Sequence, residues 1–182
     1  EVMPRLHSLL RPFPFLEGER FVTSAKHTGE CYIGIATAYA STVDTKSWNV
    51  DYERPATLSL LPPLRGLRVL DVGCGSGWYA QHLHREGATG TAFDLNPEFV
   101  ALTGARCNGG VEVFQADLAE PLSFAPDGAF DLVLCPLVLH YLRDWTPTLC
   151  EFHRVLKEGG VLVFSTHHPT MDWQLFKTDS YF

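Results

Sequence analysis

The stretch from Val69 to Ala80, VLDVGCGSGWYA, decides how this chain folds. It begins with apolar residues typical of a buried strand and continues into a turn with glycines at alternate positions, Gly73, Gly75 and Gly77. Glycines between a strand and a helix allow a ligand to approach the backbone closely. Such a turn can hold a pyrophosphate, a triphosphate or a ligand without phosphate, so the neighbouring residues must distinguish these possibilities.

The residues around the turn disfavour a phosphate ligand. A P-loop requires a lysine directly after its glycines, and this chain has no lysine between Lys46 and Lys157. A dinucleotide-binding turn has the spacing G-x-G-x-x-G, but here Trp78 occupies the third glycine position. Asp71, two residues before the first glycine, would repel a pyrophosphate and attract an ammonium group. The pattern therefore indicates a ligand with a cationic group at this turn.

Segments typical of strands and helices alternate along most of the chain. We expect helices at 52–61, 77–87, 97–107 and 145–160, and strands at 67–72, 89–95, 111–118, 129–137 and 161–168. This alternation predicts an α/β fold, a Rossmann-like, doubly wound and mainly parallel sheet in a three-layer sandwich. Ligands of such sheets bind at the carboxyl ends of the strands, which makes the residues at those ends the candidates for a site.

Acidic residues lie at two further strand ends. Asp94 closes the second expected strand about 20 residues after the first glycine, where a carboxylate can accept hydrogen bonds from ribose hydroxyls, and Asp117 closes the third. VLDVGCGSG resembles the first motif of the class I S-adenosylmethionine-dependent methyltransferases. The resemblance extends over roughly residues 52–170 and includes FDLVLCPLVLHYLRDW at 130–145. It implies a methyltransferase with S-adenosyl-L-methionine as cofactor.

The resemblance also assigns roles to individual positions. The methionine end of the cofactor would lie on Asp71, the glycine turn and the backbone near Cys135, and the ribose on Asp94. The adenine amino group would bind Asp117, with the Leu118 backbone beside the ring. The full set of cofactor-binding candidates is Asp71, Gly73, Cys74, Gly75, Gly77, Asp94, Leu95, Asp117, Leu118 and Cys135.

The methyl acceptor is expected to be a small molecule. The net charge of −7 and the scattered lysines and arginines argue against a nucleic-acid surface. CPLV at 135–138 differs from the Asn/Asp-Pro-Pro-aromatic motif of amino-methylating enzymes of DNA and RNA, and Cys135 precedes Pro136, the reverse of the order in cytosine C5 enzymes. The segment LVLHYLRDW is similar to that of small-molecule methyltransferases, including quinone-biosynthesis enzymes.

His140, in that segment, is the catalytic candidate, as a general base or as a group that orients the acceptor. A capping or packing role for His140 remains the alternative. His167 and His168 follow one another on the fifth expected strand, so at most one should reach the pocket. No metal site is predicted, because the histidines lack carboxylate partners at ligand spacing.

The composition is that of one globular domain, with 46% hydrophobic residues in 182. No apolar run is long enough to span a membrane. Five cysteines without a C-x-x-C pair, and no recognisable signal peptide, favour a cytoplasmic location. The oligomeric state is open.

Three regions are expected along the chain. Residues 1–50 form an N-terminal segment, in which Tyr39 and Trp48, with the following Tyr52, either act as a lid or pack in an ordinary way. Residues 51–170 form the S-adenosylmethionine-binding domain, and 171–182 a truncated tail, since similar enzymes continue with two more strands. Two other functions stay open, a non-catalytic S-adenosylmethionine-binding module and an NAD-dependent oxidoreductase.

Overall fold

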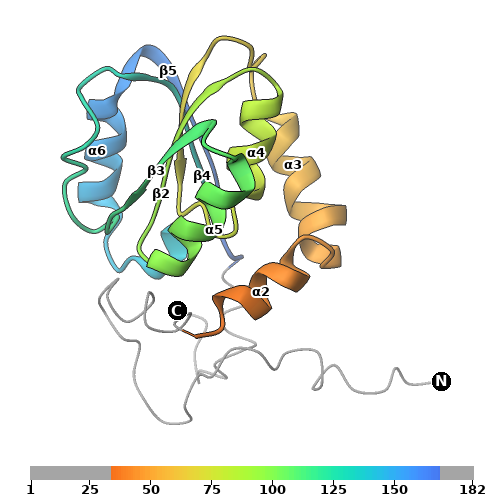
Figure 1. Ribbon diagram of the computed structural model, residues 1–182. Coiled ribbons are helices and arrows are strands. Elements are labelled where there is room, and N and C mark those ends of the chain that lie inside the picture. The colour runs from red at the N-terminus through yellow and green to blue at the C-terminus, as the bar shows by residue number, and fades with distance from the viewer. Residues whose placement is uncertain (1–33, 169–182) are drawn as a thin grey trace.

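The computed structural model describes residues 34–168, which contain one parallel five-stranded sheet of order β3-β2-β1-β4-β5. The predicted α/β Rossmann-like fold is confirmed (Figure 1). The strands are β1 (Arg68–Val72), β2 (Thr89–Asp94), β3 (Val111–Gln115), β4 (Phe130–Pro136) and β5 (Leu156–Ser165). The N-terminal residues 1–33 and the expected tail 171–182 lie outside the described residues.

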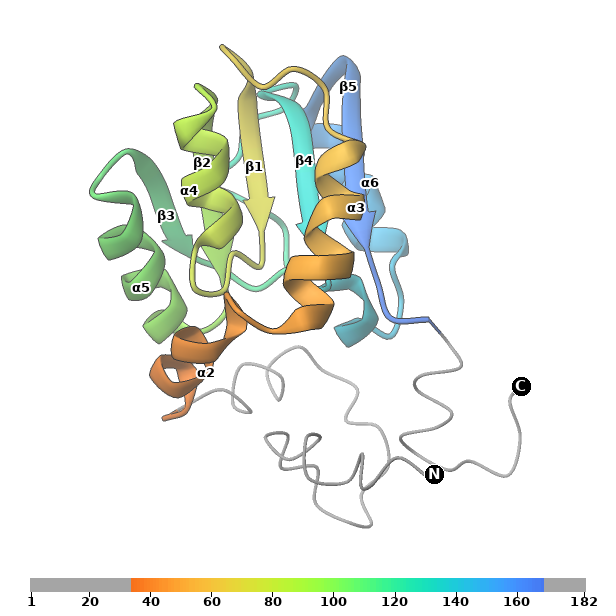
Figure 2. The same ribbon diagram turned by 90° about the vertical axis from the view of Figure 1, so that its right-hand side faces the viewer.

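Helices cover both faces of this sheet, as a three-layer sandwich requires (Figures 1 and 2). One face carries α3, α4 and α5, and the other carries α6. The helical elements are α2 (Ala36–Val43), the π-helical turn η2 (Trp48–Glu53), α3 (Arg54–Ser59), α4 (Trp78–Arg85), α5 (Pro97–Cys107), the 3-10 turn η3 (Leu139–Tyr141) and α6 (Thr146–Val155).

The hydrophobic pattern explains why β1 is central. Four consecutive residues from Val69 to Val72 are buried, because this strand has helices on both of its faces. Leu70 and Val72 pack into the cluster shared with Phe152 of α6, and Val69 packs with Leu83 of α4 on the opposite face. Alternate residues of one strand therefore join the three layers.

Strand order reverses between β1 and β4, because β1 pairs with both β2 and β4. In an open parallel sheet this switch point is where a crevice forms beyond the carboxyl ends of the strands. The glycine turn follows β1 and the segment containing His140 follows β4, so both predicted parts of the site lie beyond the carboxyl ends of these two neighbouring strands. The helix α2 lies at the same end of the sheet (Figure 2).

The helix expected at 145–160 ends five residues earlier than predicted, and this boundary was wrong. It ends at Val155, and Leu156 already pairs with Phe130 as the first residue of β5. The register then jumps from Phe130↔Leu156 to Leu132↔Val161, so Gly159 and Gly160 lie in an irregularity of the strand instead of ending the helix.

Two strand ends also differ from expectation. The third strand ends at Gln115, and Asp117 lies beyond it in a turn in which its carboxylate accepts a hydrogen bond from the Ala119 amide at 2.9 Å. The fifth strand ends at Ser165, so His167 and His168 follow it.

Within residues 34–168, no helix is long and apolar enough to cross a membrane.

Candidate active site

The glycine turn has three left-handed glycines with different surroundings. The φ angles of Gly73, Gly75 and Gly77 are 65°, 54° and 82°. A Cβ at Gly73 would collide with the Val138 side chain, and one at Gly77 would lie 2.9 Å from the Thr103 Cα, whereas one at Gly75 would meet nothing within 4 Å. Gly73 and Gly77 are thus required for packing, and Gly75 leaves its space for a ligand.

The carboxylate of Asp94 is bound to the glycine turn. Its Oδ2 accepts a hydrogen bond from the Gly75 amide at 2.9 Å, and its Oδ1 accepts one from the Asn96 amide at 2.9 Å. Burial raises the pKa of Asp94, while these two amides counteract the shift. Each oxygen has further acceptor capacity, so the carboxylate can also accept hydrogen bonds from two ligand hydroxyls.

Asp71 is almost fully buried, with 2% of its surface exposed. Among the described residues neither carboxylate oxygen has a hydrogen-bond partner of good geometry. Burial raises the pKa of Asp71 to about 7, the charge of Asp94 adds to this, and the Ala80 amide in the first turn of α4 opposes it. A buried carboxylate without a partner is costly, and a cationic ligand group would supply the missing partner.

The adenine-side candidates lie beyond β2 and β3. Asp117 is half-buried, and the side chain of Leu118 is buried in the core. The Leu118 carbonyl accepts a hydrogen bond from Thr148 Oγ1 at 3.3 Å, and the Leu95 carbonyl accepts one from Gln115 Nε2 at 3.1 Å. These two carbonyls are therefore already engaged within the protein.

Both candidate cysteines point their side chains into the protein. Cys135 is fully buried, and burial raises the pKa of its thiol. Cys74 is buried beside Thr103, whose hydroxyl lies 3.4 Å from its Sγ. Burial also raises the pKa of the Cys74 thiol. Any contact of these residues with a ligand must therefore come from their backbone.

The segment after β4 begins with a strained residue. Leu137 has φ 56°, one of two non-glycine residues in the left-handed region within residues 34–168. Its amide donates to the Ser165 carbonyl at 2.9 Å and lies 3.1 Å from the Ser165 Oγ. This conformation brings the next residue, Val138, against Gly73, so the segment from β4 contacts the glycine turn directly.

His140 follows in η3 and stacks on His167 with ring centroids 3.8 Å apart. In the part of the chain that is described, neither ring nitrogen of His140 has a hydrogen-bond partner. Burial, and secondly the neighbouring His167, lower the pKa of His140 to about 3. The imidazole is therefore neutral at physiological pH. His168 is exposed, so only His167 of the adjacent pair reaches this position.

The three aromatic residues expected in a lid differ in their surroundings. The Tyr39 ring packs edge-to-face on Phe99 at 5.8 Å, and burial followed by the nearby Tyr141 raises the pKa of Tyr39 to about 12, with a smaller contribution from Asp94. Trp48 and Tyr52 are 58% and 78% exposed on η2. The lid role of these residues stays a prediction, since η2 leaves Trp48 and Tyr52 at the surface.

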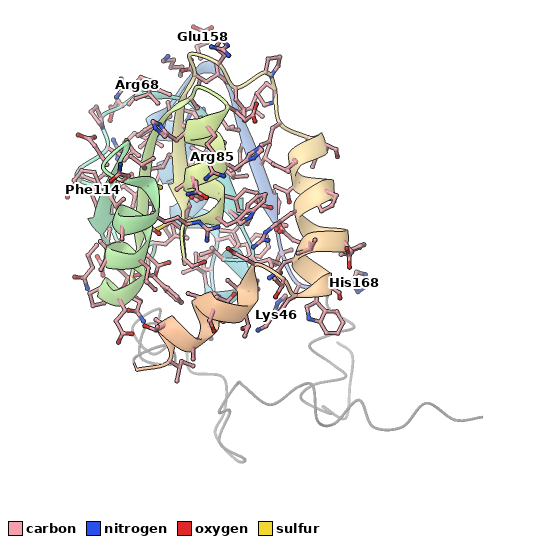
Figure 3. The ribbon with its side chains drawn as sticks, turned by 45° about the vertical axis from the view of Figure 1, so that its right-hand side comes forward. Lys46, Arg68, Arg85, Phe114, Glu158 and His168 are labelled. Atoms are coloured by element: carbon pink, nitrogen blue, oxygen red, sulfur yellow. The ribbon has the colours of Figure 1, made fainter. Side chains whose placement is uncertain are left out.

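Ion pairs connect Asp44, directly after α2, to α3 and α5. Asp44 pairs with Arg54 at 3.2 Å and with Arg106 of α5 at 2.7 Å. Arg106 also donates to the Ser76 carbonyl in the glycine turn at 3.4 Å. Figure 3 shows Lys46, which follows α2, and His168 near the same end of the molecule, with Arg68 and Glu158 at the opposite end.

Sequence reasoning missed Glu53, the last residue of η2. Its carboxylate accepts hydrogen bonds from Thr57, Tyr79 and Ser165. No motif marks this glutamate, because its partners lie up to 112 positions away.

No group of three or more histidine, cysteine or acidic side chains arranged to hold a metal is found in residues 34–168.

Comparison with known proteins agrees with this geometry. Residues 70–164, more than half of the chain, match the methyltransferase domain family. The chain is 40% identical over 111 residues to the ubiquinone biosynthesis O-methyltransferase of Xanthomonas oryzae pv. oryzae, covering 59% of this chain and 46% of that protein. It is 35% identical over 116 residues to the malonyl-[acyl-carrier protein] O-methyltransferase of Erwinia billingiae, covering 60% and 45%. The chain thus spans about half the length of the curated relatives it matches.

A solved structure gives the same result. The S-adenosylmethionine-dependent methyltransferase from Mesorhizobium loti superposes with a TM-score of 0.61 at 37% identity, over 64% of this chain and 54% of that one. Fold and site together define the class I S-adenosylmethionine-dependent methyltransferases. This chain belongs to the methyltransferase domain family, and its cofactor is S-adenosylmethionine. The family assignment replaces the NAD-dependent alternative.

The residues present fit this cofactor. The unpartnered carboxylate of Asp71 suits the ammonium of the amino-acid end, and the open space at Gly75 admits a ligand against the turn. Asp94 retains acceptor capacity for the ribose hydroxyls. When bound, the cofactor supplies a methyl group activated on a sulfonium.

Proposed function

We propose that the protein methylates a hydroxyl or other oxygen of a small-molecule acceptor by in-line displacement. The observation that carries this proposal is the contact between two parts of the site. Val138, after β4, packs on Gly73, and two residues later the half-buried His140 has two buried ring nitrogens without a hydrogen-bond partner among residues 34–168. The glycine turn, which we propose to bind the cofactor, and the neutral imidazole of His140 therefore both lie at the switch point of the sheet. The O-methyltransferase names of two relatives support the choice of oxygen.

We assign the cofactor-binding residues as the sequence predicts. Asp71 with the backbone of Gly73, Cys74, Gly75 and Gly77 binds the methionine end, together with the Cys135 backbone. Asp94 and the Leu95 backbone bind the ribose, and Asp117 with the Leu118 backbone binds the adenine. The main task of these residues is to position the reactants and exclude water, since the donor is already reactive.

His140 then acts on the acceptor. A neutral imidazole nitrogen can accept the hydrogen bond of an acceptor hydroxyl and orient its oxygen. A group with a pKa of about 3 is a weak base in the unliganded protein, so orientation is its first role. His140 takes up the hydroxyl proton only as the reaction generates it.

We expect His140→Ala to lower kcat by about 100-fold, the scale of a lost proton-transfer or orienting group, with little change in cofactor affinity. The wild-type kcat, measured at saturating cofactor, should show no acidic limb near pH 6.5, the ordinary pKa of histidine, because the pKa of His140 is lowered to about 3. Methyl transfer is measured by mass spectrometry against a panel of small phenols, alcohols and carboxylates, with RNA and DNA oligonucleotides included.

The exposed His153 of α6 provides the matched control, and His153→Ala should keep full activity. Methylation of the oligonucleotides but of no small molecule would refute the small-molecule acceptor. Tight cofactor binding without transfer to any acceptor would instead favour a non-catalytic binding module.

Binding of S-adenosylhomocysteine, the demethylated product, should release a proton from Asp71. The pKa of Asp71 is raised to about 7 in the unliganded protein, and a bound ammonium lowers it again. At pH 6.5 we expect release of roughly 0.5 proton or more per ligand, measured by calorimetry in buffers of different ionisation enthalpy. Asp71→Asn should abolish the release, and Glu112→Gln, at an exposed carboxylate on β3, should not.

The same shift has a defined sign for stability. The folded pKa of Asp71 lies above its ordinary value of 3.8, so the unliganded protein loses stability as the pH rises from about 4 towards 7. Asp71→Asn removes this contribution to the pH dependence. Wild-type protein that binds the product without releasing a proton would contradict the assigned role of Asp71.

A further inference from the structure

The Glu53 carboxylate connects three separate elements. Its Oε1 accepts hydrogen bonds from Thr57 Oγ1 of α3 and Ser165 Oγ at the end of β5, both at 2.8 Å. Its Oε2 accepts one from the Tyr79 hydroxyl of α4 at 2.9 Å. A carboxylate that receives three hydroxyl donors is strongly oriented, so η2, α4 and β5 are fixed relative to one another at this point.

One arm of this connection leads to the cofactor side. Tyr79 is the second residue of α4, directly after the glycine turn. Burial and the charge of Glu53 raise the pKa of the Tyr79 phenol, so it remains a hydrogen-bond donor. The preceding Trp78 carries the Arg54 guanidinium 4.2 Å above its ring. The start of α4 is therefore held from η2 and α3.

The other arm leads to the acceptor side. The Ser165 hydroxyl donates its proton to Glu53. The lone pairs of the Ser165 oxygen can therefore accept from the Leu137 amide, which lies 3.1 Å away. A carboxylate has no proton to give, so Glu53 fixes the direction of the Ser165 hydroxyl. Ser165 in turn holds the left-handed Leu137 that begins the segment with Val138 and His140.

We infer that Glu53 is a positioning residue that couples the cofactor turn to the acceptor segment. A change at the start of α4 moves the Tyr79 hydroxyl, then the Glu53 carboxylate, then Ser165 and the Leu137 amide. The start of α4 and the segment after β4 therefore change position together when the cofactor binds. The inference rests on the proposed function in treating the segment after β4 as the acceptor side.

Amide hydrogen exchange at Leu137, followed by NMR, tests this coupling without knowledge of the acceptor. S-Adenosylhomocysteine should slow exchange of the Leu137 amide in the wild-type protein by at least about 5-fold. In Tyr79→Phe, which removes one hydroxyl and leaves the Ser165 arm intact, the product should still bind. Its effect on Leu137 should be lost, while exchange of this amide without ligand stays as in the wild type.

Glu53→Ala should lose the ligand effect and also exchange faster at Leu137 without ligand, because both arms are cut. Asp51→Ala, at an exposed carboxylate in the same turn, is the matched control and should behave as the wild type. If Glu53→Ala does not fold, Tyr79→Phe still decides the question.

Protection of Leu137 by the product that survives in Tyr79→Phe, or that is absent from the wild type, would overturn the coupling. A merely structural role would change the melting temperature and leave the ligand effect in place. Failure of the proposed function is distinguishable, because it appears as absent methyl transfer while the exchange result stands.

Discussion

Asp94→Ala should weaken binding of S-adenosylhomocysteine by about 100- to 1,000-fold. Two hydrogen bonds from ribose hydroxyls to a carboxylate contribute roughly 3–4 kcal/mol together, taking each near the lower end of the range of about 1.5–3 kcal/mol for hydrogen bonds to charged groups. The same substitution removes the acceptor of the Gly75 amide, so the turn also loses its fixed position. Isothermal titration calorimetry with S-adenosylhomocysteine measures the effect.

Two variants separate ligand contact from turn support. Asp94→Asn keeps one side-chain oxygen for an amide and should lose less affinity than Asp94→Ala. Glu112→Ala, on the neighbouring strand β3, removes an exposed carboxylate and should bind as the wild type does. Affinity of Asp94→Ala within about 3-fold of the wild type, a difference of well under 1.4 kcal/mol, would show that this carboxylate does not hold the ribose.

The parts of the site that could be predicted are those encoded locally. The glycines and Asp71 lie within seven residues of one another, and Asp94 ends the next strand. Asn96 accepts a hydrogen bond from the Glu98 amide at 2.8 Å and caps α5, which is the usual role of an asparagine followed by proline at the start of a helix. Short-range rules therefore located both the turn and the acidic residue opposite it.

The parts that could not be predicted depend on distant contacts. Glu53 and Ser165 meet only because α3 packs beside β5. The end of α6 at Val155 is set by the pairing of Leu156 with Phe130, which overrides the usual role of a glycine pair as a helix stop. The exposure of side chains also depends on distant contacts. Trp48 on η2 lies at the surface, whereas Tyr39 on α2 lies near Asp94.

The protonation states of the site residues could not be predicted from the sequence either. Histidine after a strand suggests a base near neutral pH, but burial against His167 lowers the pKa of His140 to about 3. The pKa of Asp71 moves in the opposite direction, to about 7, because the carboxylate is buried and lies near the charge of Asp94. The two groups thus differ from their ordinary protonation because of packing, which no local motif encodes.

Substitution by alanine should affect mainly the stability of the fold at Gly77 and mainly cofactor affinity at Gly75. Gly77→Ala places a Cβ 2.8 Å from Thr103 Oγ1 and 2.9 Å from its Cα, in a left-handed residue with φ 82°. Backbone strain of about 1–2 kcal/mol adds to about 1–3 kcal/mol of overpacking. We expect a loss of about 3 kcal/mol or more in the free energy of unfolding, measured by urea denaturation.

Gly75→Ala adds the same methyl group where nothing lies within 4 Å, so the fold should lose only the left-handed strain, about 1–2 kcal/mol. Cofactor affinity should fall by about 100-fold or more, because the methyl group fills space that the ligand needs. Gly77→Ala with wild-type stability would refute the packing role of Gly77. Gly75→Ala that keeps its affinity for S-adenosylhomocysteine would show that the ligand does not lie against this part of the turn.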